Sequence, residues 1–303
     1  MLKAVDDERT PGGGVIAGRA VPVGLVLLAM LSVQTGAALA KGLFPLVGAQ
    51  GATALRVSLA AVILLAVWRP WRRPLNRQAL PAIIGFGVSL GLMNLVFYLC
   101  LRTIPLGVAV ALEFTGPLAL TLLHSRRPLD FLWIALAAGG VLLLAPVSPL
   151  SVALDPLGVG LALLAGVFWA LYIVFGTKAG RIDRGQASAL GMTIAALVAA
   201  PWGVAGAGVH LLAPNVLALG LAVALLSSAI PYSLELVAMA ALPTRTFGIL
   251  MSLEPVVAAM AGLAILGERL APLQWIAIAA VIAASAGSTA TMRTPAAAEP
   301  APN

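Results

Sequence analysis

Long apolar runs separated by short polar connections are the dominant feature of this chain. A helix that spans a bilayer needs about 20 mostly apolar residues, and ten runs of that kind are present. Their predicted bounds are 21–40, 50–68, 80–101, 105–123, 129–146, 157–177, 187–206, 215–241, 246–266 and 272–291. Only 10% of the 303 residues are charged, whereas a soluble domain carries about a quarter. The chain is therefore predicted to be an all-α membrane protein with ten transmembrane helices.

The Lys and Arg residues predict how the chain lies across the membrane, because cytoplasmic loops are enriched in them. With the N-terminus inside, Lys41, Arg102 and Arg269 fall outside and Arg56 falls within the second run. The other fourteen of the 18 basic residues then fall in cytoplasmic segments. Both termini are therefore predicted to be cytoplasmic. The net charge of +7 comes from these loops, so no nucleic-acid partner is expected.

One proline skeleton occurs twice, 138 positions apart. Pro105 and Pro117 bracket an apolar run in the first half, and Pro243 and Pro255 bracket one in the second. Further landmarks at nearly the same offset are the pairs Lys41 and Lys178 (137 apart) and Trp133 and Trp275 (142 apart). Chance placement of prolines at helix starts is the alternative to a repeat. Each half holds five runs, and an odd number inverts the second copy, which is the inverted-repeat plan of secondary transporters.

The repeat divides the chain into four predicted parts. These are a cytoplasmic N-terminal tail (1–20), a first repeat of five helices (21–146), a second repeat (157–291) and a disordered cytoplasmic tail (292–303). The last part is rich in Ala and Pro, a composition typical of disorder. The first 20 residues hold three acidic residues and a Gly triplet, so they do not resemble a cleaved signal peptide.

Glu113 is the leading candidate for substrate binding or proton coupling, because ionisable groups within a membrane are costly and usually face a cavity or a partner. It lies eight residues beyond Pro105, about 12 Å into its helix. Pro117 lacks an N–H, so the carbonyl of Glu113 loses its helical donor. The Thr115 hydroxyl adds another oxygen, and Gly116 leaves room for close approach. Such oxygens favour an ammonium ligand, and the carboxylate can exchange a proton. The alternative for Glu113 is a pair with Arg56 or Arg102 that only holds helices together.

Glu254 and Arg56 are the next candidates. Glu254 stands one residue before Pro255 and is predicted to line the site, with pairing to Arg245 or bracing of the proline kink as alternatives. Arg56 is predicted to hold a substrate carboxylate through a bidentate fork. The alternative for Arg56 is a structural counter-ion role for a glutamate such as Glu113.

A third cluster follows another proline. Pro231 removes the helical donor of the Ser227 carbonyl, and Tyr232 and Glu235 come directly after it. We expect this cluster to line the pathway, with a simple helix break as the alternative. Lys41 is expected to snorkel to the outer surface. Further polar candidates on apolar helices, each with an interhelical hydrogen bond as its alternative role, are Gln34, Asn94, Tyr98 and Tyr172.

Few residues suit enzyme or cofactor chemistry. Gly87, Ser89 and Gly91 spell a G-x-S-x-G pattern, but a nucleophile elbow needs a strand-to-helix turn, and this pattern lies in an apolar run. An intramembrane serine protease that uses Ser89 with His124 stays open as an alternative. The single Cys100 and two separated histidines predict no disulfide, no metal site and no cofactor.

Four runs resemble the bacterial threonine and homoserine exporters, in the EamA-domain branch of the drug/metabolite transporter superfamily. They are AKGLFPLVG (40–48), VAVALEFTGP (108–117), LPTRTFG (242–248) and MSLEP (251–255). The resemblance covers residues 20–293. It implies ten helices in two EamA repeats, an inner-membrane location and export of small amino acids in exchange for protons. The acidic N-terminal extension and the Ala/Pro-rich tail depart from the family pattern, and no residue role is transferred from the family.

The residues and the resemblance together predict a secondary transporter for a zwitterionic amino acid. Glu113 is expected to meet the ammonium group or the coupling proton, and Arg56 or a helix terminus the carboxylate. The expected partners are a small amino acid, protons and the lipid bilayer. Efflux of another metabolite or a cationic drug is the alternative within transport, and a non-transporting membrane scaffold is a further one.

Overall fold

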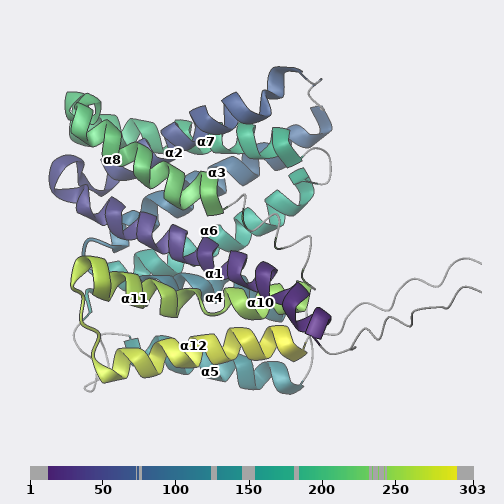
Figure 1. Ribbon diagram of the computed structural model, residues 1–303. Helices are drawn as coiled ribbons and strands as arrows, with labels where there is room; N and C mark the ends of the chain where they lie inside the picture. The colour runs from purple at the N-terminus through teal and green to yellow at the C-terminus, as the bar shows by residue number, and fades with distance from the viewer. Residues whose placement is uncertain are drawn as a thin grey trace, which may run out of the picture.

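The computed structural model describes residues 13–72, 74, 77–123, 128–144, 154–180, 184–231, 234, 238, 242 and 244–291. Within these ranges every regular element is a helix (Figure 1). The predicted C-terminal tail and residues 1–12 of the predicted N-terminal tail lie outside the described residues.

The first half of the chain contains α1 (Gly13–Gly42), α2 (Phe44–Trp68), α3 (Leu80–Cys100), α4 (Leu106–Leu123) and α5 (Pro128–Leu144). The second half contains α6 (Pro156–Gly180), α7 (Arg184–Ala207), α8 (Pro214–Ala224), the π-helical turn η4 (Leu225–Ala229), α10 (Thr244–Met251), α11 (Glu254–Leu266) and α12 (Pro272–Thr291). Short 3-10 turns are η1 (Pro70–Arg72), η2 (Arg77–Ala79) and η3 (Gly208–Leu212).

Seven of the described helical segments are long and apolar enough to cross a membrane. Shorter apolar helices cover Leu106–Leu120, Phe131–Leu143 and Pro214–Ser228. The prediction of an all-helical membrane protein is therefore confirmed for the part of the chain that the structure describes.

The helices run roughly along one common direction (Figure 1). In that view α2, α3, α7 and α8 form one side of the bundle, α5 and α12 form the other, and α1, α4, α6, α10 and α11 lie between them. Helix α1 begins and α12 ends at the same end of the bundle (Figure 1). Lys41, in the last turn of α1, marks the opposite end, which we call the Lys41 end.

The predicted run 246–266 coincides with a segment long and apolar enough to cross a membrane, Thr246–Leu266, but a turn interrupts its helix. Helix α10 ends at Met251, and α11 begins at Glu254 after a turn at Ser252 and Leu253. Pro255 explains the break, because it has no N–H to donate to the carbonyl four residues earlier and its ring clashes with that carbonyl. Pro117, its counterpart in the repeat, instead lies inside the continuous helix α4.

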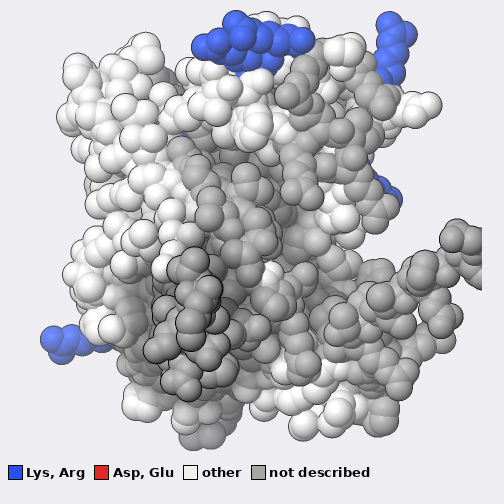
Figure 2. Space-filling view, turned by 45° about the vertical axis from the view of Figure 1, so that its right-hand side comes forward, with Lys and Arg blue, Asp and Glu red and all other residues white. Residues whose placement is uncertain are grey.

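The outer surface of the bundle suits lipid. Figure 2 shows a face on which Lys and Arg side chains lie at the margins, while the described surface between them carries almost no charge. Large apolar side chains such as Val62, Leu142 and Leu197 are exposed. A water-soluble monomer rarely exposes apolar surface on this scale, so this surface agrees with a membrane protein.

Asp155 caps the start of α6, next to the α3–α4 connection. Its carboxylate accepts hydrogen bonds from the amides of Leu157 (3.3 Å) and Gly158 (3.1 Å). A hydrogen bond from the Thr103 hydroxyl, followed by these amides, holds the pKa of Asp155 below its ordinary value. Because folding lowers this pKa, the ionised carboxylate stabilises the folded chain at neutral pH, and this stabilisation is lost as the pH falls through the folded-state pKa.

Asp155→Ala is therefore expected to lower the Tm of the purified protein at pH 7, because the first amides of α6 lose their acceptor. The difference in Tm from the wild type should narrow once the pH falls below the ordinary aspartate pKa of about 3.9. Asp155→Asn is the matched control, since its amide oxygen still accepts the backbone hydrogen bonds. Equal Tm values for the wild type and Asp155→Ala at pH 7 would contradict this role.

Candidate functional site

A buried polar contact joins α1 to α11 in the interior of the bundle. The Nε2 atom of Gln34 donates a hydrogen bond of 3.1 Å to Oε1 of Glu254, and both residues are buried. Glu254 stands in the first turn of α11, directly after the break that Pro255 causes. The Oε1 atom of Gln34 is buried and accepts no hydrogen bond from the described residues. Buried oxygens are rarely left unsatisfied in native proteins, so this atom is a candidate acceptor for a ligand.

Glu113 lies close to this contact. Its side chain is buried in α4, and it is near enough to Glu254 and Arg56 to interact electrostatically with both. The structure therefore brings together two acidic residues and one cation that are far apart in the sequence and come from three helices. The like charges of Glu113 and Glu254 oppose each other, and a nearby positive charge relieves that repulsion. The cluster can consequently accommodate a second positive group, either a proton or an ammonium.

Arg56 hydrogen-bonds to neutral oxygens in this structure. Its Nη1 atom donates to the Tyr98 hydroxyl (3.2 Å) and its Nη2 atom to the Ser227 carbonyl (3.3 Å). The guanidinium carbon lies 5.5 Å from the centroid of the Tyr98 ring, within cation–π range. The Ser227 carbonyl is available because Pro231, four residues on, has no N–H. In the described part of the chain Arg56 forms no direct ion pair, so its predicted structural pairing with a glutamate is not found there.

Three other predicted candidates do not join this cluster through any described hydrogen bond. The Asn94 amide donates to the Leu90 carbonyl in its own helix at 2.8 Å. The Thr115 hydroxyl likewise donates to the Leu112 carbonyl, at 2.6 Å. Tyr172 stacks on Phe86 with ring centroids 4.9 Å apart. Asn94 and Thr115 thus bond back to their own helices, as short polar side chains often do. Tyr232 and Glu235 lie outside the described residues.

Gly116 makes a close approach, although not to a ligand. A Cβ atom at this position would lie 1.9 Å from the carbonyl oxygen of Gly166, and one at Gly166 would lie 2.6 Å from the carbonyl oxygen of Glu113. Helices α4 and α6 therefore cross with backbone against backbone. The space that the sequence predicted for a substrate is filled here by α6.

A cavity of about 220 Å³ lies beside this crossing. Its lining residues are Phe114, Pro117, Leu118, Trp169, Gly248, Met251, Ser285, Ser288 and Thr289. The ring of Trp169 meets that of Phe114 edge to face at 5.2 Å. Because α4 starts at the Lys41 end, Phe114 to Leu118 lie in the half of the bundle farther from Lys41. Pro117 is one helical turn beyond Glu113, so the cavity adjoins the cluster of charges.

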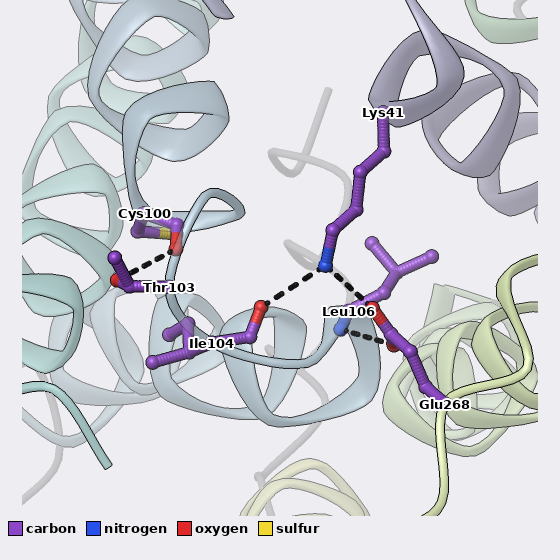
Figure 3. Close-up of polar contacts among 6 residues, drawn as sticks. All are labelled: Lys41, Cys100, Thr103, Ile104, Leu106 and Glu268. Carbon is purple, nitrogen blue, oxygen red and sulfur yellow. Dashed lines mark hydrogen bonds and ion pairs between the residues drawn. The ribbon is translucent and has the colours of Figure 1, made fainter. Parts of the chain in front are cut away.

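A second polar cluster occupies the Lys41 end (Figure 3). The Nζ atom of Lys41 forms an ion pair of 2.5 Å with Oε1 of Glu268 and donates to the Ile104 carbonyl at 3.5 Å. The second carboxylate oxygen of Glu268 accepts a hydrogen bond of 2.8 Å from the Leu106 amide. The expectation that Lys41 simply snorkels to the surface was therefore wrong, because it pairs with a residue of the other half.

Glu268 was not predicted as a functional residue. It lies in the short connection between α11 and α12, where a charged side chain is ordinarily attributed to solvent. One sequence signal pointed to it indirectly. The amide of Leu106 has no helical acceptor because it lies in the first turn of α4, and acidic side chains are favoured near such helix starts.

Comparisons with known proteins agree with this architecture. Residues 156–290 match the EamA-like transporter family. The chain is 53% identical over 274 residues to the threonine/homoserine exporter RhtA of Escherichia coli (strain K12). This alignment covers 90% of this chain and 92% of that protein. The protein of the same name from Salmonella typhimurium (strain SL1344) is 52% identical with the same coverage. The uncharacterized transporter YwfM of Bacillus subtilis (strain 168) is 28% identical over 72% of this chain and 76% of its own length.

A solved crystal structure shares the fold at a TM-score of 0.55, covering 91% of this chain and 96% of its own. Its sequence identity is 21%, so the likeness concerns the fold alone.

Proposed function

Because this chain belongs to the EamA-like transporter family, we propose that it exports threonine and homoserine across the inner membrane in exchange for protons. The observation that carries this proposal is the buried cluster of Glu113, Glu254 and Arg56. The cluster lies in a chain that is similar over nine-tenths of its length to threonine/homoserine exporters. A zwitterionic amino acid presents an ammonium and a carboxylate, and this cluster offers a partner for each.

The ammonium group would bind between Glu113 and the buried Oε1 atom of Gln34. The substrate carboxylate would bind Arg56 in place of its present neutral partners, since a guanidinium bonds more strongly to a carboxylate than to neutral oxygens. The side chain of the amino acid would then reach into the adjoining cavity, where Ser288 and Thr289 offer hydroxyl groups to the substrate hydroxyl.

Exchange follows from competition for one carboxylate. A proton and an ammonium group cannot both neutralise Glu113. The site therefore holds either the amino acid or a proton whenever the transporter switches between its inward-open and outward-open states. A proton arriving from outside displaces the ammonium and favours release of the amino acid there. The proton gradient across the membrane then drives net export.

We further propose ten membrane spans in two inverted repeats, with the three shorter apolar helices completing the set. Related packing pairs support this arrangement. In such a repeat α1 corresponds to α6, α2 to α7, α3 to α8, α4 to the span formed by α10 and α11, and α5 to α12. The packing of α4 on α6 is then equivalent to the packing of α11 on α1. The packing of α3 on α7 is likewise equivalent to the packing of α8 on α2. Three further packed pairs each join a helix to its own counterpart in the other half: α2 with α7, α5 with α12 and α4 with α11.

The proposed orientation places both termini in the cytoplasm. The connection between α2 and α3, which holds Arg69, Arg72 and Arg77, lies at the end where α1 begins (Figure 1). The Lys41 end then faces outward, in accord with the enrichment of basic residues in cytoplasmic loops.

Transport in proteoliposomes tests the proposal. We expect counterflow of threonine and homoserine that an imposed proton gradient accelerates, and weaker transport of valine, which has the shape of threonine without its hydroxyl. A lipophilic cation such as tetraphenylphosphonium tests the alternative of cationic-drug efflux, which the two buried acidic residues would also suit. Transport of the cation without transport of either hydroxy amino acid would overturn the proposal.

A further inference from the structure

The cluster at the Lys41 end ties the two halves of the chain together. Lys41 ends α1 of the first half, and Glu268 belongs to the α11–α12 connection of the second half. Their contacts also hold the backbone on both sides of Pro105, through the Ile104 carbonyl and the Leu106 amide (Figure 3). Three segments that are remote in sequence are thus held at one point by a single ion pair.

The Lys41–Glu268 ion pair lies over the interior of the bundle and not only at its edge. The side chains of Lys41 and Glu268 are 23% and 14% exposed, so the pair is largely shielded from water. Cys100, at the end of α3, is fully buried nearby and interacts electrostatically with both Lys41 and Glu113. The thiol is therefore close both to the Lys41–Glu268 pair and to the cluster of charges in the interior. The cavity beside that cluster is lined by residues farther from Lys41, and a separate cavity of about 290 Å³ at the Lys41 end is lined by Glu268, Arg269 and Trp275 among others. In this conformation the ion pair and its backbone contacts join the three segments across the Lys41 end.

We propose that Lys41 and Glu268 form the outer gate of the transporter, and that Lys178 and Asp130 form its inner counterpart when the outer gate is open. This inference rests on the proposed transport function. Each gate takes a lysine from the end of the first helix of one half and an acidic residue near the start of the last helix of the other half.

The repeat supplies the argument for the inner gate. Lys178 stands 137 positions after Lys41, and Asp130 stands 138 positions before Glu268. Pro243 likewise stands 138 positions after Pro105, so the whole constellation recurs at the offset of the repeat. Lys178 lies in the last turn of α6 and is exposed in this structure.

Asp130 belongs to the first turn of α5, and its side chain lies outside the described residues. Because the second repeat is inverted, the counterpart of a gate at the Lys41 end belongs at the cytoplasmic end.

Each ion pair then stabilises one of two conformations. Loss of one pair shifts the population toward the state in which that gate is open. The ratio of the two states changes tenfold for each ~1.4 kcal/mol of differential stabilisation that is lost. Couplings of this kind typically amount to between about fivefold and 150-fold. An interaction that merely braces the fold would instead leave the balance between the two states unchanged.

Cys100 provides a built-in reporter, since it is the only cysteine in the chain. The experiment measures its labelling by a membrane-impermeant methanethiosulfonate added to the outside of right-side-out vesicles that contain the full-length protein. We expect Lys41→Met and Glu268→Gln each to accelerate labelling about tenfold. Lys178→Met and Asp130→Asn should slow it by a similar factor, because they favour the conformation that is closed outside. Arg269→Gln, which removes an exposed cation next to Glu268, is the matched control and should label as the wild type does.

The doubly reversed variant Lys41→Glu/Glu268→Lys separates gating from misfolding, since it restores the ion pair with opposite polarity. The swap does not restore the hydrogen bonds to the Ile104 carbonyl and the Leu106 amide. We therefore expect labelling slower than in either single variant but faster than in the wild type, whereas a protein that is merely unfolded would label as fast as the single variants or faster. Unchanged labelling in both single outer variants would overturn the outer gate. Unchanged labelling in both Lys178→Met and Asp130→Asn would overturn its inner counterpart.

Labelling requires no transported substrate, so the gate and the proposed function can fail separately. A protein that shows the expected labelling but moves neither threonine nor homoserine retains the gate and loses the proposed substrates. A protein that transports both but labels equally in all variants retains the function and loses the gate.

Discussion

Replacement of Glu113 by Gln is expected to abolish proton-driven export while the protein stays folded. Glutamine has nearly the same shape as glutamate, but it can neither pair with an ammonium nor carry the coupling proton. Removal of one member of a buried charged contact costs about 2 kcal/mol or more. We therefore expect export of threonine at pH 7 to fall at least about 30-fold. Any residual transport should no longer respond to the proton gradient.

The same substitution should leave the thermal stability unchanged or raise it. Glu113 interacts with the like charge of Glu254, and like charges held close together in a low-dielectric interior are costly. Replacement of Glu113 by a neutral group relieves that cost. The measurement is the Tm of the purified protein in detergent, taken beside the export rate from proteoliposomes at several pH gradients. A lower Tm together with lost export would point to a structural role and contradict the proposed coupling role.

Ser89→Ala is the matched control for Glu113→Gln. Ser89 is also buried in a helix of the first half, and its loss should leave export unchanged. This variant also tests the intramembrane-protease alternative, in which Ser89 would be essential. Export by Glu113→Gln at the wild-type rate and with the wild-type pH dependence would show that another residue couples protons to transport.

The largest effect on stability is expected from Gly116→Ala. The added Cβ would lie 1.9 Å from the carbonyl oxygen of Gly166, and the carbonyl carbon and Cα of the same residue are also within 3 Å. These are backbone atoms, so no rotation of a side chain relieves the clash. Helices α4 and α6 must separate, and we expect a loss of about 3 kcal/mol or more of stability. The yield of folded protein and its Tm in detergent measure this loss.

Gly160→Ala in α6 is the matched control, because a Cβ there meets no atom within 4 Å. Alanine is the better helix former by about 0.8–1.0 kcal/mol, so this variant should be as stable as the wild type or slightly more stable. Gly166→Ala places a Cβ 2.6 Å from the Glu113 carbonyl and should resemble Gly116→Ala in direction. Wild-type stability of Gly116→Ala would contradict the backbone contact between α4 and α6.

Hydropathy predicted the class of this fold because a bilayer span has one simple requirement, which is an apolar run of sufficient length. Interruptions of helices were harder to predict. Pro117 and Pro255 look equivalent in the sequence, yet α4 continues through the first, and the chain between α10 and α11 breaks just before the second. A proline always removes one hydrogen bond, but tertiary packing decides whether the helix bends or stops.

The sequence predicted the acidic residues of the candidate site but not most of the residues that contact them. Buried carboxylates are costly, so Glu113 and Glu254 stand out in the sequence alone. Partners are not visible there, because Gln34 meets Glu254 across 220 positions and Lys41 meets Glu268 across 227. The contact of Arg56 with the Ser227 carbonyl was partly foreseeable, since Pro231 predicted that this carbonyl lacks its helical donor.

The packing of the helices has a consequence for how this chain can be divided. Helix α4 is seated against α6, and α1 against α11, so each half completes its core with helices of the other. The largest cluster of buried apolar residues draws on α1, α2, α3 and α4 as well as on α6, α8, α11 and α12. A half expressed alone would expose the glycine face at Gly116 or Gly166 and would have no partner for it. The unit that was duplicated is half of the chain, but the unit that folds is the whole of it.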